Sequence, residues 1–310
     1  MVAATNEIGR RILVPFDGSE MAEQALPYAR TMAAPGAELL LAHVDSNSEP
    51  VAHRPVRATG EAGQRGDEAA RQRLETIGEQ LRHDWPELRI VTVAGSGNPK
   101  KEIMRICGER DVDLIVMASR GRNEPTRRVL GSLADQIACE AAIAVMVVPP
   151  RDGTADADRG SVRRLVVPQD GSEQARCAVA VAEALANRWD VPIELVAALD
   201  PRYGVPPESL VAGDDARRDV LAELRAEAQE MLERVGARIM RTRADVAWQL
   251  LDGPAPDAIL GAIRDGDLVV LTSRGRSGVS RWPLGSVAEK VVRYASVPVI
   301  VHRGQPVAAV

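Results

Sequence analysis

Short apolar runs alternate along the chain with longer stretches in which apolar residues recur every three or four positions. The short runs are rich in Val, Ile and Leu, which favours β-strands, and the longer stretches have the period of amphipathic helices. Runs such as LIVM (114–117) and LVVL (268–271) are apolar on both faces, as expected of parallel strands covered by helices on each side. The pattern therefore predicts an α/β fold built on parallel sheets.

The two halves of the chain are predicted to contain the same elements in the same order. Strands are expected at 11–15, 38–44, 89–93, 113–118 and 143–148 in the first half, and at 164–168, 193–199, 245–250, 267–272 and 297–301 in the second. Helices are expected at 20–33, 67–84, 99–109 and 131–141, and the second half contains a long helix around Ala222–Gly236. Each half is thus predicted to be a doubly wound, five-stranded sheet, which binds ligands beyond the carboxyl ends of its strands.

The halves are two copies of one domain. RRILVPFDGSEMAEQAL from Arg10 and RRLVVPQDGSEQARCAV from Arg163 agree at ten of seventeen positions. The segments that begin at Val112 and Gly266 agree at twelve of twenty-six. The polar stretch PPRDGTADADRGSV (149–162) lacks an apolar period and is typical of a linker. We expect one domain at 1–152 and the other at 161–310.

Composition narrows the class of protein. The chain has 310 residues, of which 45% are hydrophobic and 27% charged, enough for two globular cores. Its longest apolar run, AAIAVMVV (141–148), is far below the roughly 18 residues of a membrane span, and the N-terminus lacks the apolar centre of a signal peptide. We therefore expect a cytoplasmic protein with no membrane association. The three cysteines lack metal-site spacing and are expected to be reduced, buried thiols.

Charge disfavours nucleic acid as a partner. The net charge is −5, and one Phe with three Tyr offers few surfaces on which bases could stack. Four arginines nevertheless gather within nine residues, at Arg120, Arg122, Arg127 and Arg128. A local basic loop on an acidic chain suits a small phosphate-containing ligand.

Both first strands end in the sequence DGS. Ser19 is placed to cap the helix that follows, which is an ordinary strand-to-helix turn. Asp17, repeated as Asp170, has two interpretations that the sequence leaves open. The carboxylate could cap the helix, or it could accept hydrogen bonds from a ribose or bind a hydrated metal ion.

A glycine-containing loop follows the fourth strand of each half. Gly121 can take positive φ and admit a ligand to the backbone, and nine residues later Gly131 and Ser132 open a helix whose N–H groups can bind an anion. The second half repeats this as Gly275, Gly285 and Ser286. One helix terminus contributes only about 0.3 to 2 kcal/mol, whereas micromolar ATP binding needs about 8 kcal/mol. Several donors must therefore act together.

These motifs resemble the universal stress protein family, in a tandem two-domain form. The resemblance covers nearly the whole chain through VPFDGS, VPQDGS, the second-strand ends, and the loops SRGRNEPTRRVLGS and SRGRSGVSRWPLGS. It implies ATP, with or without Mg²⁺ at Asp17 or Asp170, held by the glycine loop, with the main chain at the second-strand end meeting adenine. It also implies that the last strands of the two halves pair, so that one chain imitates a dimer; association of two chains is left open. The residues that the resemblance assigns to nucleotide binding are Asp17, Val44, Ala118, Gly121, Arg122, Gly131 and Ser132, and in the second half Asp170, Leu199, Thr272, Gly275, Arg276, Gly285 and Ser286.

Both halves depart from the family pattern at one position. ATP-binding members carry GxxG, nine residues, then Gly and Ser or Thr, but the first Gly is Ala118 in one half and Thr272 in the other. In the first loop Pro125 also removes a backbone donor and Glu124 adds a negative charge. We therefore expect the two sites to differ in affinity.

Three functional hypotheses remain at this stage. The first is an ATP-binding regulatory protein that contacts a protein partner, the second is a slow ATP hydrolase, and the third is a partner-binding protein that has lost the nucleotide. Efficient catalysis is disfavoured, because no activating base accompanies Asp17 or Asp170. The glycines of GSGNPKKEI (95–103) lack the full dinucleotide fingerprint and predict an ordinary turn. The four histidines lack metal-ligand spacing and are expected at surface or filler positions.

Overall fold

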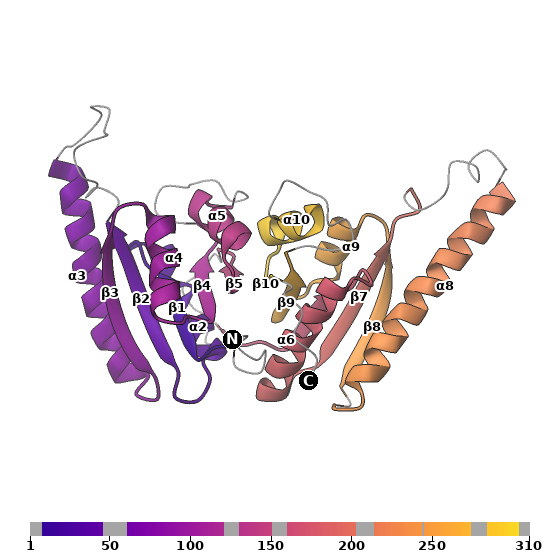
Figure 1. The fold of residues 1–310 in the computed structure, drawn as a ribbon, viewed down its shortest axis with the longest axis horizontal. Helices are drawn as coiled ribbons and strands as arrows, with labels where there is room; N and C mark the ends of the chain where they lie inside the picture. Colours follow the sequence, from indigo (N-terminus) through magenta and orange to yellow (C-terminus); the bar gives the residue numbers. More distant parts are fainter. Residues whose placement is uncertain are drawn as a thin grey trace. The chain divides into compact units, whose positions relative to one another are not determined.

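The computed structural model describes residues 8–45, 61–120, 130–150, 160–202, 214–243, 245–273 and 284–303. The chain separates into two compact units, one within Glu7–Ser161 and the other within Val162–Val310. Each unit is a five-stranded, wholly parallel sheet with helices packed on it, which confirms the predicted fold class (Figure 1).

The first unit has the strand order β3-β2-β1-β4-β5. Its elements are β1 (Arg11–Pro15), α1 (Glu20–Glu23), α2 (Leu26–Met32), β2 (Glu38–Asp45), α3 (Glu61–Asp84), β3 (Arg89–Ser96), α4 (Pro99–Glu109), β4 (Leu114–Ala118), α5 (Ser132–Glu140) and β5 (Ala144–Val148). The order reverses direction between β1 and β4, so a ligand site is expected beyond the ends of these strands.

The second unit repeats this topology in the order β8-β7-β6-β9-β10. Its elements are β6 (Arg164–Pro168), α6 (Glu173–Trp189), β7 (Ile193–Leu199), α8 (Asp214–Ile239), β8 (Val246–Asp252), α9 (Ala255–Ala262), β9 (Asp267–Thr272), α10 (Ser286–Tyr294) and β10 (Val299–His302). The expected strands are all present, with ends displaced by no more than three residues.

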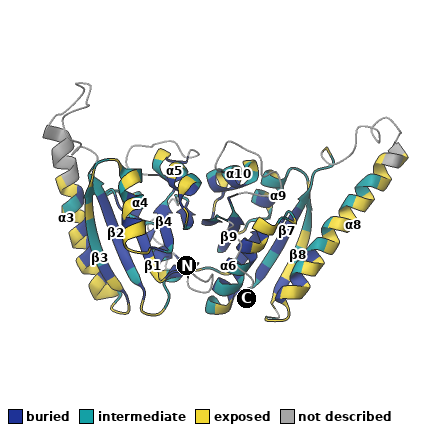
Figure 2. Cartoon of the chain, in the orientation of Figure 1, coloured by how far each residue is buried: buried dark blue, intermediate teal, exposed yellow. Residues whose placement is uncertain are grey.

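Helices cover both faces of the sheet in the first unit. A side chain at Gly78 of α3 would meet Thr92 of β3, and a side chain at Gly95 of β3 would meet Glu102 of α4. Because Thr92 and Gly95 are three residues apart on one strand, they point to opposite faces. Consequently α3 covers one face and α4 the other, and the sheet between them is a core layer (Figure 2).

The central strands explain why the apolar runs have no polar face. Ile12 and Leu13 of β1 are fully buried, as are Leu114 and Ile115 of β4. Adjacent residues on a strand point to opposite faces, so both faces are covered there. The apolar runs LIVM and LVVL therefore belong to strands that are buried on both faces of the sheet, as predicted.

One predicted helix differs from the structure. The stretch 20–33 forms two helices, α1 and α2, separated at Gln24 and Ala25. Pro27 occupies the first turn of α2, where its missing N–H and fixed φ are compatible with a helix start but not with a helix interior. The break is therefore a local consequence of Pro27.

An aspartate stands at the amino end of the fourth strand of each unit, and different groups donate hydrogen bonds to its carboxylate in the two units. Asp113 of the first unit accepts hydrogen bonds from the main-chain N–H groups of Gly9 (2.6 Å), Arg10 (2.9 Å) and Arg11 (2.8 Å). Its counterpart Asp267 instead accepts from the Arg164 guanidinium, at 2.9 Å from Nε and 2.6 Å from the second nitrogen, and from the Arg264 N–H at 2.7 Å. Asp267 is buried, so Arg164 is its counter-ion.

Candidate functional site

The DGS turns form the same structure in both units. Gly18 has φ +78° and Gly171 has φ +80°, a region that favours glycine. Asp17 Oδ1 accepts hydrogen bonds from the Ser19 N–H (3.0 Å) and hydroxyl (2.5 Å), and Ser19 Oγ caps α1 by accepting from the Ala22 N–H (3.2 Å). In this way the carboxylate orients the helix cap.

The second turn repeats this geometry. Asp170 Oδ1 accepts from the Ser172 N–H at 2.9 Å, and Ser172 Oγ caps α6 by accepting from the Ala175 N–H at 3.1 Å. In both units the N-cap residue is therefore the serine, and the aspartate holds that serine rather than capping the helix itself. Their predicted role toward ribose or metal remains a prediction.

The end of β2 extends past β1. The β1–β2 ladder ends with the Phe16 N–H donated to the Ala42 carbonyl at 2.7 Å. Main-chain groups of alternate residues point to the same neighbouring strand, so those of Val44 point to the β1 side, above the last β1 residue. Asp45 points the other way, because its carbonyl accepts the Gly97 N–H at 2.8 Å. Val44 therefore presents main-chain groups to the space beyond β1, where the family resemblance predicts adenine.

The corresponding position in the second unit is Ala198. The Gln169 N–H is donated to the Val196 carbonyl at 2.7 Å, as Phe16 bonds Ala42, and Ala198 lies two residues further. The Leu199 carbonyl accepts the Gly253 N–H at 2.9 Å, which makes Leu199 the counterpart of Asp45. The sequence comparison, which placed Leu199 opposite Val44, is therefore displaced by one residue in this strand.

The glycine loops are fixed at both ends by the same hydrogen bonds. In the first unit the Ser119 N–H is donated to the Val148 carbonyl and the Gly131 N–H to the Ser119 carbonyl, both at 2.7 Å. In the second unit Ser273 bonds His302 at 2.9 Å and Gly285 bonds Ser273 at 2.7 Å. Gly121, Arg122, Gly275 and Arg276 lie outside the described residues, as do Glu124 and Pro125. Strand end and helix start are thus held together at the rim in both copies.

The helices that follow these loops begin without a side-chain cap. Gly131 and Gly285 are the N-cap residues of α5 and α10 and have no side chain with which to cap these helices. By contrast Ser19, Asn98 and Ser172 cap α1, α4 and α6. The Gly131 and Gly285 N–H groups are used by the strand-end serines, so an anion at either helix start would have to meet main-chain N–H groups that follow the glycine in the first turn.

Sequence reasoning named one further polar side chain at this rim and missed another. Arg120, one of the arginines of the predicted basic loop, lies two residues after β4 and is only 9% exposed, which is unusual for arginine. The side chain that was missed is His302. His302 at the end of β10 is in register with Thr272 at the end of β9. In the first unit the matching pair is Ala118 and Val148. The positions of the histidines in the sequence do not reveal this pair, because Thr272 and His302 become neighbours only when β9 and β10 pair.

Burial determines the protonation state of His302 and of Cys107. Burial lowers the pKa of His302, so its imidazole is neutral at pH 7. Burial raises the pKa of Cys107 to about 12, which keeps it a thiol. Cys107 and Cys177 are buried, as predicted, and Cys139 is half-buried. Among the described residues no group of three or more His, Cys, Asp or Glu side chains could hold a metal ion.

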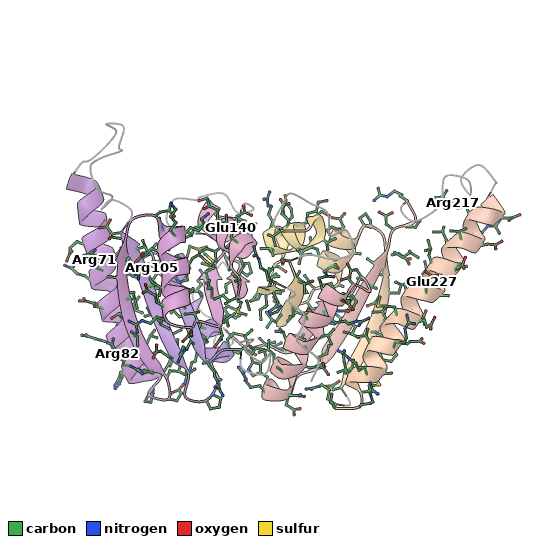
Figure 3. All side chains as sticks on the ribbon, viewed as in Figure 1. Arg71, Arg82, Arg105, Glu140, Arg217 and Glu227 are labelled. Atoms are coloured by element: carbon green, nitrogen blue, oxygen red, sulfur yellow. The ribbon has the colours of Figure 1, made fainter. Side chains whose placement is uncertain are left out.

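The side chains of α4 that lie next to the end of β3, beside Val44, are polar. Gly95, paired with Val44, leaves space that the Glu102 side chain fills, and Arg105 holds Glu102 through contacts of 2.6 and 2.9 Å (Figure 3 labels Arg105). The hydrogen bonds from Arg105 hold the pKa of the Glu102 carboxyl below its usual range. In the second unit the turns at Gly97 and Gly253 match, with φ of +105° and +107°. The counterparts are therefore Leu251 and Ala258, and this wall is apolar.

No helix in the described part of the chain has the length and apolar character needed to span a membrane.

The universal stress protein family model matches residues 9–149 and 161–303. A universal stress protein of Mycolicibacterium smegmatis is 27% identical over 315 residues, which cover 98% of this chain and 99% of that protein. The universal stress protein MJ0531 of Methanocaldococcus jannaschii is 29% identical over 144 residues, 45% of this chain and 81% of that protein.

A solved structure has the same fold over nearly the full length. The crystal structure of a universal stress protein from Archaeoglobus fulgidus matches with a TM-score of 0.65 at 18% identity, covering 95% of this chain and 96% of that one. At this identity the match concerns the fold alone. Two matches of the family model, one in each unit, together with the full-length relative, establish that the chain belongs to the universal stress protein family as a tandem two-domain member.

Proposed function

We propose that each unit binds ATP beyond the carboxyl ends of its strands, and that occupancy alters the surface offered to a protein partner. The observation that carries the proposal is the repeated rim: a glycine bonded to the strand-end serine, followed by an uncapped helix start. The N–H groups and dipole of a helix start can bind an anion, and the repetition of this arrangement in both units supports a shared ligand. The duplicated turn alone would not require a ligand.

The described residues fit the parts of an adenine nucleotide. The Ser132 and Ser286 ends of α5 and α10 suit phosphate, since N–H groups and the helix dipole both favour negative charge there. The main chains of Val44 and Ala198 suit the edge of a base, which carries both donors and acceptors. Ala118 and Thr272 lie between these parts, at the ends of β4 and β9.

A bound Mg²⁺ would be held mainly by phosphate oxygens. Such ions are usually bound by one or two carboxylates together with substrate phosphates. Asp17 and Asp170 are the candidate carboxylates, with one oxygen of each used by the cap. The ion would neutralise phosphate charge.

The hydrolase alternative is distinguished by its products. Within the described residues Asp17 and Asp170 accept hydrogen bonds from the N-cap serines Ser19 and Ser172, which suits structural roles better than proton transfer. The purified chain is heated, the precipitate removed and the supernatant analysed for nucleotide. ATP supports the binding proposal, and ADP with phosphate release on incubation supports hydrolysis. If no ATP binds at millimolar concentration, the proposal is wrong.

The site itself is tested with Gly131→Val/Gly285→Val. Both glycines are in extended conformations that any residue adopts, with φ and ψ of −63° and 147°, and −68° and 152°. The valines add bulk at the helix start without straining the backbone. Gly131→Ala/Gly285→Ala is the matched control, because alanine loses the glycine cap with less bulk. Unchanged ATP affinity in the valine variant would remove the site assignment.

A further inference from the structure

The second unit places an imidazole beside its candidate cradle. Thr272 and His302 end two adjacent parallel strands and are paired in register. Paired residues point to the same face of the sheet with Cβ atoms about 5 Å apart. The His302 carbonyl accepts the Ser273 N–H at 2.9 Å, and Ser273 in turn accepts the Gly285 N–H at 2.7 Å. The histidine is therefore tied to the same strand-end rim as the glycine loop.

Its imidazole has unused hydrogen-bonding capacity. His302 Nδ1 is buried and has no hydrogen-bond partner within the described part of the chain. A buried polar atom without a partner is unfavourable, so a ligand group that forms a hydrogen bond with it gains affinity. The first unit has no such group, since Ala118 and Val148 occupy the matching positions.

We propose that Thr272 and His302 form a polar pair that contacts the nucleotide in the second unit, and that His302 takes up a proton when phosphate binds. This inference rests on the proposed ATP site. It makes binding in the second unit strengthen as pH falls, whereas the first unit lacks this contribution. The two sites then respond differently to the same change in pH.

The charges around His302 are consistent with a neutral resting state. Burial alone lowers its pKa. Within the second unit, the elements that pack most closely against β10 are β9 and α10. On β9 the partner Thr272 does not titrate and Asp267 lies at the opposite end. On α10 Glu289 pairs with Arg293 at 3.1 Å, and Lys290 is the remaining charge there; Arg303 follows in the chain. A phosphate would bring a strong negative charge that favours the protonated imidazole.

The expected pH dependence follows from the two protonation states. The free imidazole has a lowered pKa and the complex a raised one, so affinity rises as pH falls between them. One coupled proton changes affinity by at most about tenfold per pH unit. The ATP phosphates also titrate, and a comparison between variants that differ only at His302 removes the contribution of free ATP, which is the same for both.

The test uses the full chain with Gly131→Val, which leaves the second site, and titrates ATP calorimetrically from pH 6 to 8. Two buffers of different ionisation enthalpy give the number of protons taken up. Adding His302→Val, which copies Val148, is expected to remove the extra uptake and flatten the pH dependence, and Thr272→Ala, which copies Ala118, to weaken ATP binding severalfold. Equal proton uptake with and without His302→Val, while ATP still binds, would overturn this inference alone.

A second measurement does not depend on the fold of the variants. In the unsubstituted chain the imidazole proton resonances of His302 are titrated with and without ATP, after assignment with His302→Val. Its pKa is expected to rise when ATP binds; an unchanged pKa would contradict the contact. Failure of ATP to bind to any form of the chain would overturn the proposed function and this inference with it.

Discussion

The two units share the main-chain hydrogen bonds of a rim and differ at several side chains beside it and at the opposite ends of the strands. The DGS turn, the strand-end serine and the glycine at the helix start have the same main-chain hydrogen bonds in both units. By contrast, Asp113 and Asp267 are stabilised by different donors, and Gly95 with Glu102 is replaced by Leu251 with Ala258. Main-chain geometry is thus the same in the two units while several side chains differ, and the proposal of one ligand class for both units rests on the shared geometry.

The largest expected difference concerns the amino ends of the strands. Arg164→Leu should cost about 3 to 5 kcal/mol of unfolding free energy, because it leaves buried Asp267 without its counter-ion. The matched change Arg11→Leu should cost less than about 0.5 kcal/mol, since Arg11 is exposed and pairs with exposed Asp111. Urea unfolding followed by tryptophan fluorescence measures both. Equal costs would contradict the proposed difference.

The second prediction concerns the packing of Gly95 against Glu102, whose counterparts in the second unit are Leu251 and Ala258. Gly95→Leu should cost about 1 to 3 kcal/mol, because an added Cβ lies 2.6 Å from Glu102 Cγ. Combining it with Glu102→Ala recreates the second unit's pair and should recover most of the loss. Thermal unfolding of the single and double variants tests this, with Glu102→Ala alone as the control. Additive costs would show that the two residues do not compete for space.

The shared turns should respond alike. Ser172→Ala and Ser19→Ala each remove a helix cap and should each lower the unfolding free energy by about 1 kcal/mol. Replacing either serine with threonine keeps the hydroxyl and should restore most of it. Urea unfolding measures both effects. A large cost in only one unit would mean that the turns are not equivalent.

The smallest effect should appear only in acid. The pKa of His302 is lowered in the folded chain, so between this value and its unfolded value near 6.5 the unfolded chain binds more protons. Stability that is present above that range is lost as pH falls through the folded pKa. His302→Val should therefore lose less stability than the unsubstituted chain between pH 7 and pH 5. Parallel melting temperatures across this range would contradict the burial of a neutral imidazole.

Sequence patterns predicted the layers of the fold because burial on two faces leaves a direct trace. Strand β4 is an uninterrupted apolar run, β9 contains the apolar run LVVL, and the DGS turns need glycine for positive φ. Pro27 also carried the signal for the broken helix, since proline favours a helix start. These features depend on residues that are close together in the chain.

Features that depend on strand adjacency were not predictable in this way. The displacement from Leu199 to Ala198 follows from hydrogen-bond register, which the dissimilar second strands do not reveal. Thr272 and His302 are thirty residues apart and become neighbours only through the β9–β10 ladder. Arg164 and Asp267 meet for the same reason, through β6 and β9. In each of these cases a residue of one strand interacts with a residue of the neighbouring strand that is distant in the sequence.

The central claim, one ATP site in each unit, is tested most directly by counting bound nucleotides. Equilibrium dialysis with ATP should give two per unsubstituted chain, one for Gly131→Val or Gly285→Val, and none for the double variant. Unchanged circular dichroism would show that the variants keep their fold. Two bound nucleotides in the double variant, or none in the unsubstituted chain, would contradict the account.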